Sequence, residues 1–176
     1  MSADDARFDP AVIIAALDQH GVEYVVVGGI AAQAHGATRA TSDLDCVPRS
    51  TIENLKCLAA AMQELGARLR VEGMSDDEAR QLPVQLDADM LARLRVSTWV
   101  TDAGLFDVLM DIPARHGGRR TYADLVERSD RRRTGGVVVR VASLDDIIES
   151  KEFAARVKDL EALPELRELA NRGHEE

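Results

Sequence analysis

Along the chain, segments in which apolar residues are spaced as in a helix alternate with segments that have the pattern of a strand. From Pro10 to His20 the apolar side chains recur every three or four residues, and Gly21 follows, which predicts an amphipathic helix that stops at the glycine. The continuous β-branched run at 23–27 predicts a strand covered on both faces. Two glycines then lead into a short helix expected over Ile30–His35, and a second strand is expected over Asp43–Val47.

The rest of the chain continues this alternation. A Ser three positions before an acidic residue has the spacing of a capping box, which predicts where a helix begins. The expected helices are Ser50–Leu65, a short one opened by Ser75, another opened by Thr121, one from Ser143 to Val157, and a last one restarted by Pro164 and reaching Asn171. The expected strands are Leu94–Thr101, Leu105–Asp111 and Val137–Val141, the first two joined by a tight turn at 102–104. This order predicts an α/β or α+β fold, with helices flanking a small mixed β-sheet.

Length and composition indicate one compact unit. The 176 residues are 45% hydrophobic and 30% charged, which is an ordinary globular composition. The two cysteines are too few for a disulfide framework and lack the neighbours that a zinc site needs. The acidic N-terminus and the absence of a long apolar run predict a cytoplasmic protein with no membrane segment.

The net charge and the local charge clusters point to different binding partners. The net charge of −9 argues against nonspecific nucleic-acid binding over the whole surface, because phosphate neutralisation needs clustered Lys and Arg. Two local clusters exist nevertheless, one formed by Arg115, Arg119 and Arg120, and the other by the run 131–133 in the connection RSDRRRTGG. Each cluster is either a solvated loop or a docking surface for an anionic substrate.

Two aspartates stand one residue apart in the second expected strand. Because side chains on a strand alternate between faces, Asp43 and Asp45 point the same way, roughly 6.6–7 Å apart along the backbone. Two carboxylates on one face repel, and a cation between them or protonation of one relieves the repulsion. Hard divalent cations such as Mg²⁺ prefer oxygen ligands of this kind. The pair is therefore a candidate metal site, the alternative being two ordinary exposed residues.

A third acid satisfies the same test of parity. In the expected strand Leu105–Asp111 the even-numbered positions are apolar and suit the core, whereas Asp107 and Asp111 fall on the opposite face. If this strand lies beside Asp43–Val47, Asp107 can face the same metal ions as the pair. Asp111, just before Pro113, is expected to be a solvated residue at the end of the strand.

Two further features suit an anionic ligand. Gly28 and Gly29 stand between a buried strand and a helix, where backbone N–H groups can approach a phosphate closely, although a plain turn is the alternative. Lys151 falls on the apolar stripe of its expected helix, so its ammonium group either snorkels to solvent or meets an anion. Lys158 continues that stripe two helical steps later, and Asp159 follows it.

These residues together resemble a known family. The segments GGIAAQAHGATRATSDLD, FDVL and SLDDIIESKEFAARVKDLEAL are similar to those of the minimal nucleotidyltransferases of the polymerase-beta superfamily, most closely the AbiEii and MenT toxin branch. The resemblance runs from Tyr24 to Leu163, although the stretch from Thr51 to Leu94 carries no motif. It implies a nucleotidyltransferase core over residues 1–142 and a C-terminal helical part, 143–176, that completes the active site.

The resemblance also implies roles for individual residues. The metal ligands would be Asp43, Asp45 and Asp107, holding Mg²⁺ as two ions. The nucleotide-binding residues would be Gly28, Gly29, Arg39, Ser42 and Lys151. The late acid of the family, which acts on the acceptor or shapes the site, would be Asp159. One departure is Ile30, which stands where the family often has a serine after the glycines, so a hydroxyl contact to phosphate is absent there.

The implied reaction is nucleotidyl transfer from a nucleoside triphosphate to an acceptor hydroxyl, with release of pyrophosphate. Toxins of the resembling branch modify the 3′ end of transfer RNA, which makes transfer RNA the expected acceptor and an antitoxin protein a further expected partner. A small molecule or a protein hydroxyl is the alternative acceptor. A non-catalytic module that only binds nucleotide is a third hypothesis, disfavoured by the intact acids and Lys151.

Overall fold

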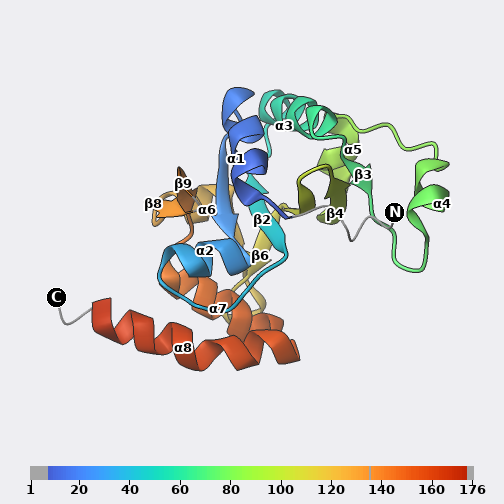
Figure 1. The fold of residues 1–176 in the computed structure, drawn as a ribbon. Coiled ribbons are helices and arrows are strands. Elements are labelled where there is room, and N and C mark those ends of the chain that lie inside the picture. Colours follow the sequence, from blue (N-terminus) through green and yellow to red (C-terminus); the bar gives the residue numbers. More distant parts are fainter. Residues whose placement is uncertain (1–7, 135, 174–176) are drawn as a thin grey trace.

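The computed structural model describes residues 8–134 and 136–173. The acidic N-terminal segment at 1–7 lies outside this part of the chain, as do residues 174–176 and Gly135 within the arginine-rich connection. In the described part, a seven-stranded mixed sheet lies between two groups of helices (Figure 1). This architecture confirms the fold class expected from the order of strands and helices.

The large sheet has the strand order β3-β4-β5-β2-β1-β9-β8. Its members are β1 (Tyr24–Val27), β2 (Asp43–Pro48), β3 (Arg68–Leu69), β4 (Val96–Thr101), β5 (Gly104–Leu109), β8 (Asp130–Thr134) and β9 (Val137–Val141). β2 runs parallel to β5, and β1 runs parallel to β9, whereas the other neighbours are antiparallel. A separate two-stranded sheet joins β6 (Asp111–Pro113) to β7 (Arg119–Thr121). The acid-bearing strands β2 and β5 are therefore neighbours near the middle of the large sheet.

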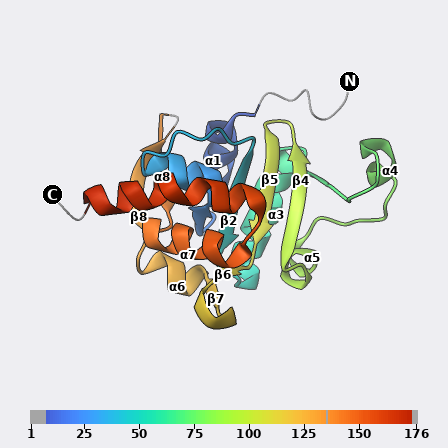
Figure 2. The same cartoon turned by 90° about the horizontal axis from the view of Figure 1, so that it is seen from below.

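The helices cover both faces of the large sheet. They are α1 (Pro10–Gln19), α2 (Gly28–Ala34), α3 (Ile52–Glu64), α4 (Asp76–Arg80), α5 (Ala88–Arg93), α6 (Tyr122–Val126), α7 (Leu144–Ala154) and α8 (Val157–Gly173), with a 3₁₀ turn at Arg115–Gly117. Figures 1 and 2 show α1 and α3 on one face and α7 and α8 on the other. Among the helices of the described part, none has the length and apolar character needed to cross a bilayer.

The core forms where the sequence pattern places apolar side chains. On β5, Phe106 and Val108 are fully buried, as the even-numbered parity predicts, and on β2 Leu44 and Cys46 are fully buried as well. Trp99 of β4 is buried too, and its indole N–H donates to the hydroxyl of Ser97 at 2.8 Å. One face of the central strands is thus committed to the core, which leaves the opposite face for the acids.

Capping side chains fix most helix starts as the sequence predicts, with one exception. Ser75 and Thr121 both form capping boxes, and the hydroxyl of Ser143 accepts a hydrogen bond from the N–H of Asp146. The expectation that Ser50 caps α3 is wrong. The hydroxyl of the next residue, Thr51, accepts the N–H of Asn54 at 3.4 Å, so the helix begins one residue later.

The C-terminal helices differ from the expectation in two respects. α7 ends at Ala154, because Ala155 adopts a left-handed conformation with φ 52°. The stripe expected to continue through Lys158 is therefore interrupted, and Lys158 belongs to a second helix. Pro164 does not restart a helix but lies inside α8, where the burial of Ala162, Leu163 and Leu166 offsets the lost backbone hydrogen bond.

Four further elements, β8, β6, β3 and α5, differ from what the pattern predicts. The arginine run 131–133 is not a loop but part of β8, an edge strand antiparallel to β9, where exposed charges are well tolerated. β5 ends at Leu109, and Asp111 belongs to β6. The short elements β3 and α5 lie in segments for which no strand and no helix was expected.

Candidate active site

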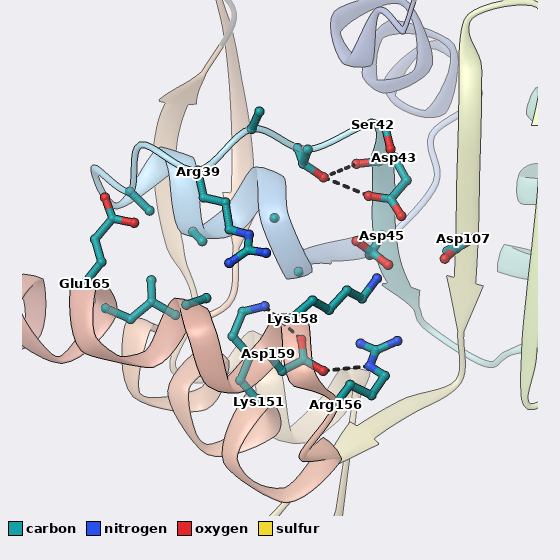
Figure 3. A pocket seen from close by; sticks show the side chains of 18 residues that line it. Arg39, Ser42, Asp43, Asp45, Asp107, Lys151, Arg156, Lys158, Asp159 and Glu165 are labelled. Atoms are coloured by element: carbon teal, nitrogen blue, oxygen red, sulfur yellow. Dashed lines mark hydrogen bonds and ion pairs between the residues drawn. The ribbon is translucent and has the colours of Figure 1, made fainter. Parts of the chain in front are cut away.

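Three acids converge on one face of the large sheet. Asp43 and Asp45 lie on β2, and Asp107 lies on β5 directly opposite Asp45 in the parallel register. One carboxylate oxygen from each of the three residues lies within 4.8 Å of the other two. Figure 3 shows the three side chains pointing into the same space, toward α8. The structure thus brings together the three acids that parity singled out.

These carboxyl groups repel one another in a partly buried environment. Burial, followed by the charges of Asp43 and Asp107, raises the pKa of Asp45 to about 7. Burial likewise raises the pKa of Asp107, whose Oδ1 is buried without a hydrogen-bond partner among the described residues. The hydroxyl of Thr41 donates to Asp43 Oδ1 at 2.8 Å and orients that carboxylate. The cluster therefore has oxygen lone pairs and negative charge that no nearby hydrogen-bond donor fully satisfies.

Gly28 and Gly29 pack against this cluster. α2 begins at Gly28, two residues earlier than expected, so the glycines form its first turn and not a loop before it. Gly28 has φ 64°, and a Cβ atom there would lie 2.2 Å from Asp45 Oδ2; a Cβ on Gly29 would lie 2.6 Å from the hydroxyl oxygen of Thr41. Only glycine fits at both positions. The side chain of the residue before the helix, Val27, makes no capping hydrogen bond to its first turn.

Cationic side chains from α7, from α8 and from the connection between them face the acids across a cavity. Lys151 Nζ lies 3.2 Å from Asp159 Oδ1, and Arg156 Nε lies 2.6 Å from Asp159 Oδ2. Burial alone would raise the pKa of Asp159, but the hydrogen bonds from Arg156 and Lys151 outweigh it and lower the pKa. In Figure 3 the side chain of Lys158 extends toward Asp45 and Asp107. Its charge opposes the rise in pKa of both carboxyl groups.

One cavity of about 440 Å³ joins these groups. Every site residue expected from the sequence lines it: Gly28, Gly29, Arg39, Ser42, Asp43, Asp45, Asp107, Lys151 and Asp159. Arg39 is half-exposed at its edge and pairs with Glu161 at 3.0 Å. The cavity is bounded by α2, by the loop before β2, by the acid strands and by α8 (Figure 3). A ligand in it would meet carboxylates on one wall and ammonium or guanidinium groups on another.

Several solved structures have a similar arrangement of helices and strands. The antibiotic-resistance factor ANT(2″)-Ia, in a complex with adenylyl-2″-tobramycin, matches with a TM-score of 0.56 and 19% identity, covering 95% of this chain and 97% of that one. The lincomycin-bound lincosamide antibiotic adenylyltransferase LnuA matches with a TM-score of 0.56 and 11% identity, covering 93% and 99%. By sequence, the chain matches no family model and no curated protein.

The chain has a nucleotidyltransferase fold. A third neighbour, the Thermotoga maritima protein TM1012, proposed to be a nucleotidyltransferase, agrees with this at a TM-score of 0.51 and 14% identity, covering 96% of this chain and 98% of that one. At these identities the likeness is one of fold. The roles of the individual side chains remain predictions that rest on the geometry of the site.

The acid cluster suits a divalent cation. Its donors are carboxylate oxygens, which hard cations prefer, and the orphaned Oδ1 of Asp107 would gain a partner on cation binding. A cation would also relieve the repulsion that raises the pKa of Asp45. The residues present therefore fit the metal that the nucleotidyltransferase fold implies.

Sequence reasoning gave no role to four polar residues of the cavity: Thr41, Arg156, Lys158 and Glu165. Thr41 precedes the acid strand and gave no periodic signal. Lys158 was placed on the same stripe as Lys151 without a role, and Arg156 was not singled out. The available signal was the clustering of three cations, with Lys151, in an otherwise acidic C-terminal segment.

The first arginine cluster is engaged in ion pairs with acids of the same chain. Arg115 and Arg120 pair with Glu149 of α7 at 2.9 and 2.6 Å, and Arg119 donates to Asp111 at 2.7 Å. Asp111 is consequently not the solvated residue expected from the sequence, because its side chain is only 15% exposed. These arginines hold β6 and β7 to α7 and are not a free basic surface.

Proposed function

We propose that the protein is a nucleotidyltransferase that moves a nucleoside monophosphate from a nucleoside triphosphate to an acceptor hydroxyl. The observation that carries the proposal is the convergence of Asp43, Asp45 and Asp107 on a cavity that also contains a glycine helix start and Lys151. In the reaction, a bond forms between the acceptor oxygen and the α-phosphorus, the bond to pyrophosphate breaks, and the acceptor proton leaves. The nucleotidyltransferase neighbours support this class of chemistry.

Metal binding falls to the three acids in this proposal. Asp43, Asp45 and Asp107 would hold Mg²⁺, as two ions, and such ions stabilise the attacking and leaving oxygens of an in-line displacement. Asp107 also accepts the acceptor's proton, directly or through water, since it has a buried oxygen free of hydrogen bonds within the described structure. Thr41 keeps Asp43 in position through its hydroxyl group.

The remaining cavity residues bind the triphosphate. Backbone N–H groups at Gly28 and Gly29 approach the phosphates, and a Cβ atom at either position would collide with Asp45 or Thr41 of the same site. Arg39, Ser42 and Lys151 supply further contacts, and residues 143–176 complete the site by delivering Lys151 and Lys158 from α7 and α8. Asp159 orients Lys151 and does not itself reach the acceptor, because both its oxygens already accept hydrogen bonds from cations.

Two acceptors compete in the proposal, transfer RNA and a small molecule. The transfer-RNA hypothesis, with a toxin role, an AbiEii or MenT relationship and an antitoxin partner, needs a basic surface that binds a phosphate backbone. The cluster Arg115–Arg120 is occupied by internal ion pairs, which weakens that support. The neighbours ANT(2″)-Ia and LnuA are solved with adenylyl-2″-tobramycin and with lincomycin. A small-molecule hydroxyl is therefore the favoured acceptor, and the 3′ end of transfer RNA is the second candidate.

The test is transfer of label from each α-labelled nucleoside triphosphate in the presence of Mg²⁺. Total RNA and a panel of hydroxylated small molecules serve as separate acceptors. We expect transfer by the unmodified protein and none by Asp43→Ala, while Asp102→Asn, which alters an exposed acid outside the cavity, retains activity. Absence of label from every acceptor, or equal labelling by Asp43→Ala, would remove the proposed function.

The toxin hypothesis has its own test. Growth arrest on expression that depends on Asp43 and accompanies labelling of transfer RNA would support it. Labelling of a small molecule without RNA labelling and without growth arrest would exclude it.

A further inference from the structure

A second cavity adjoins the acid cluster and shares Gly28 and Asp45 with the first. It has a volume of about 240 Å³ and lies between the β4–β5 pair, β6 and α7. Its apolar lining consists of Val27 of β1 together with Val96, Leu109, Ile112, Pro113, Ile147 and Ala154. Figure 2 shows β6 and α7 close to the lower end of β5, in agreement with this boundary. We call it the apolar cavity, and the larger one the nucleotide cavity.

The two cavities meet at the proposed reaction centre. Both are lined by Gly28, Asp45, Lys151, Arg156 and Asp159. An in-line displacement needs the attacking oxygen and the leaving pyrophosphate on opposite sides of the phosphorus. With the triphosphate in the nucleotide cavity, a hydroxyl that approaches from the opposite side would come from the apolar cavity.

Positive and negative side chains nearly balance at the apolar cavity. Its three cations are all paired, Arg119 with Asp111, and both Lys151 and Arg156 with the single carboxylate of Asp159. A polyanion such as RNA would meet only cations that already have a carboxylate partner, and it would also meet the carboxylate of Asp45. A polycation would find one available carboxylate, since Asp159 is bound by Lys151 and Arg156. The charges thus favour an uncharged occupant.

The lining and the volume of the apolar cavity further limit which ligands it can bind. Val96 is 55% exposed although it is a large apolar side chain, so a ligand lying on it would remove apolar surface from water. Ser150 and Asp45 are the lining residues that have a polar side chain without an ion-pair partner in the described part of the chain. Its 240 Å³ equals the space of about eight water molecules, which is enough for one ring-sized group.

We propose that the apolar cavity binds the acceptor, an uncharged alcohol with a compact apolar body whose hydroxyl faces Asp45. This inference rests on the proposed nucleotidyl transfer and names the chemical class of its acceptor. The acceptor oxygen attacks the α-phosphorus, its proton passes to Asp107 or water, and pyrophosphate leaves through the nucleotide cavity.

Cyclohexanol is a suitable probe, because it combines one hydroxyl with one apolar ring. With Mg²⁺ and a non-hydrolysable nucleoside triphosphate analogue bound, we expect cyclohexanol to shift the methyl NMR signals of Val96, Leu109 and Ile112. Ala154→Leu fills the cavity from α7, and we expect it to weaken cyclohexanol binding at least tenfold while nucleotide binding is unchanged. Ser150→Leu, one helical turn earlier, provides a second variant if the first does not fold.

Ala40→Leu is the matched control, because Ala40 lines the nucleotide cavity and not the apolar cavity. It should weaken nucleotide binding and leave the cyclohexanol shifts intact. Cyclohexanol shifts confined to the nucleotide cavity, or an Ala154→Leu variant that binds the probe normally, would overturn the inference.

Label transfer separates this inference from the proposed function. Cyclohexanol, a polycationic aminoglycoside and transfer RNA are offered as acceptors with α-labelled nucleoside triphosphate, and we expect transfer to cyclohexanol that Ala154→Leu reduces. Transfer to RNA or the aminoglycoside alone would overturn the inference and leave nucleotidyl transfer standing. Methyl shifts without transfer to any acceptor would overturn the proposed function, and would support the apolar cavity as a binding site for a compact alcohol.

Discussion

The acid cluster and Glu149 are two sites of partly or fully buried carboxylate with opposite surroundings. Glu149 on α7 has a side chain 8% exposed and accepts direct hydrogen bonds from Arg120. Burial opposes its ionisation, but Arg120 and Arg115 lower its pKa overall. Asp45 has no cation in direct contact within the described chain, and its pKa rises to about 7. An acid with its own arginines is part of the scaffold, whereas an acid left with other acids is suited to an external cation.

The largest expected difference between the acid cluster and Glu149 is in the rate of nucleotidyl transfer. Asp107→Asn removes one carboxylate charge and the proposed proton acceptor with almost no change in volume, so nucleotidyl transfer should fall about 10²–10⁴-fold. Glu149→Gln should retain activity per folded molecule, because Glu149 does not line the nucleotide cavity. Initial rates measured on folded protein, with far-UV circular dichroism as the check on folding, decide this. Equal losses in the two variants would contradict the comparison.

The next effect concerns stability at Glu149. Glu149→Gln removes a charge that two arginines contact, and we expect a loss of about 1–3 kcal/mol in the free energy of unfolding at pH 7. Because the folded state lowers this pKa, the contribution is present above the pKa of the unfolded chain and disappears as the pH falls through the folded value. Urea unfolding of both proteins at pH 7 and at acidic pH measures it. A difference that persists unchanged in acid would rule out this electrostatic account.

The effect of Asp45 on stability should depend on pH in the opposite direction to that of Glu149. Its folded pKa of about 7 exceeds the ordinary value, so the folded state binds more protons and the stability of the metal-free protein falls as the pH rises toward 7. Asp45→Asn removes this penalty and should stabilise the metal-free protein by roughly 2 kcal/mol above pH 7, after allowance for solvent screening, and by little near pH 4. Thermal unfolding with a chelator present measures the effect. Destabilisation at high pH would show that Asp45 is part of the scaffold.

Magnesium should reverse that order of stability. Addition of Mg²⁺ is expected to raise the melting temperature of the unmodified protein and not that of Asp45→Asn, since only the former keeps the complete acid cluster. Calorimetric scans at several Mg²⁺ concentrations, with Asp102→Asn as a control, measure this shift. An equal shift in all three proteins would place cation binding elsewhere.

The smallest expected effect concerns Lys158. Its charge partly offsets the rise in pKa at Asp45 and Asp107, so Lys158→Met should raise both pKa values further. We expect a change of a few tenths of a pH unit, since the charge acts across a hydrated cavity. Carboxyl ¹³C NMR titration of the metal-free protein records it, with Lys56→Met, on α3, as control. Unchanged titration would show that Lys158 does not act on the acids.

Much of the fold and of the site could be predicted from local pattern. The period of two placed Asp43, Asp45 and Asp107 on solvent-side faces and Phe106 in the core, and capping pairs located the starts of α4, α6 and α7. The errors arose where local pattern competes with tertiary contacts. The arginine run became an edge strand because β9 offers it a partner, and Pro164 is tolerated because its neighbours on α8 are buried.

The sequence by itself determined which residues are candidates for the chemistry, because alternation along a strand and glycine at a helix start are local properties of the chain. Only the tertiary structure decided how these residues lie relative to one another. The parallel pairing of β2 with β5 sets Asp107 opposite Asp45, and the left-handed turn at Ala155 folds α8 back so that Asp159 meets Lys151. Pairing of distant strands and the packing of successive helices depend on burial throughout the molecule, and no local period encodes them.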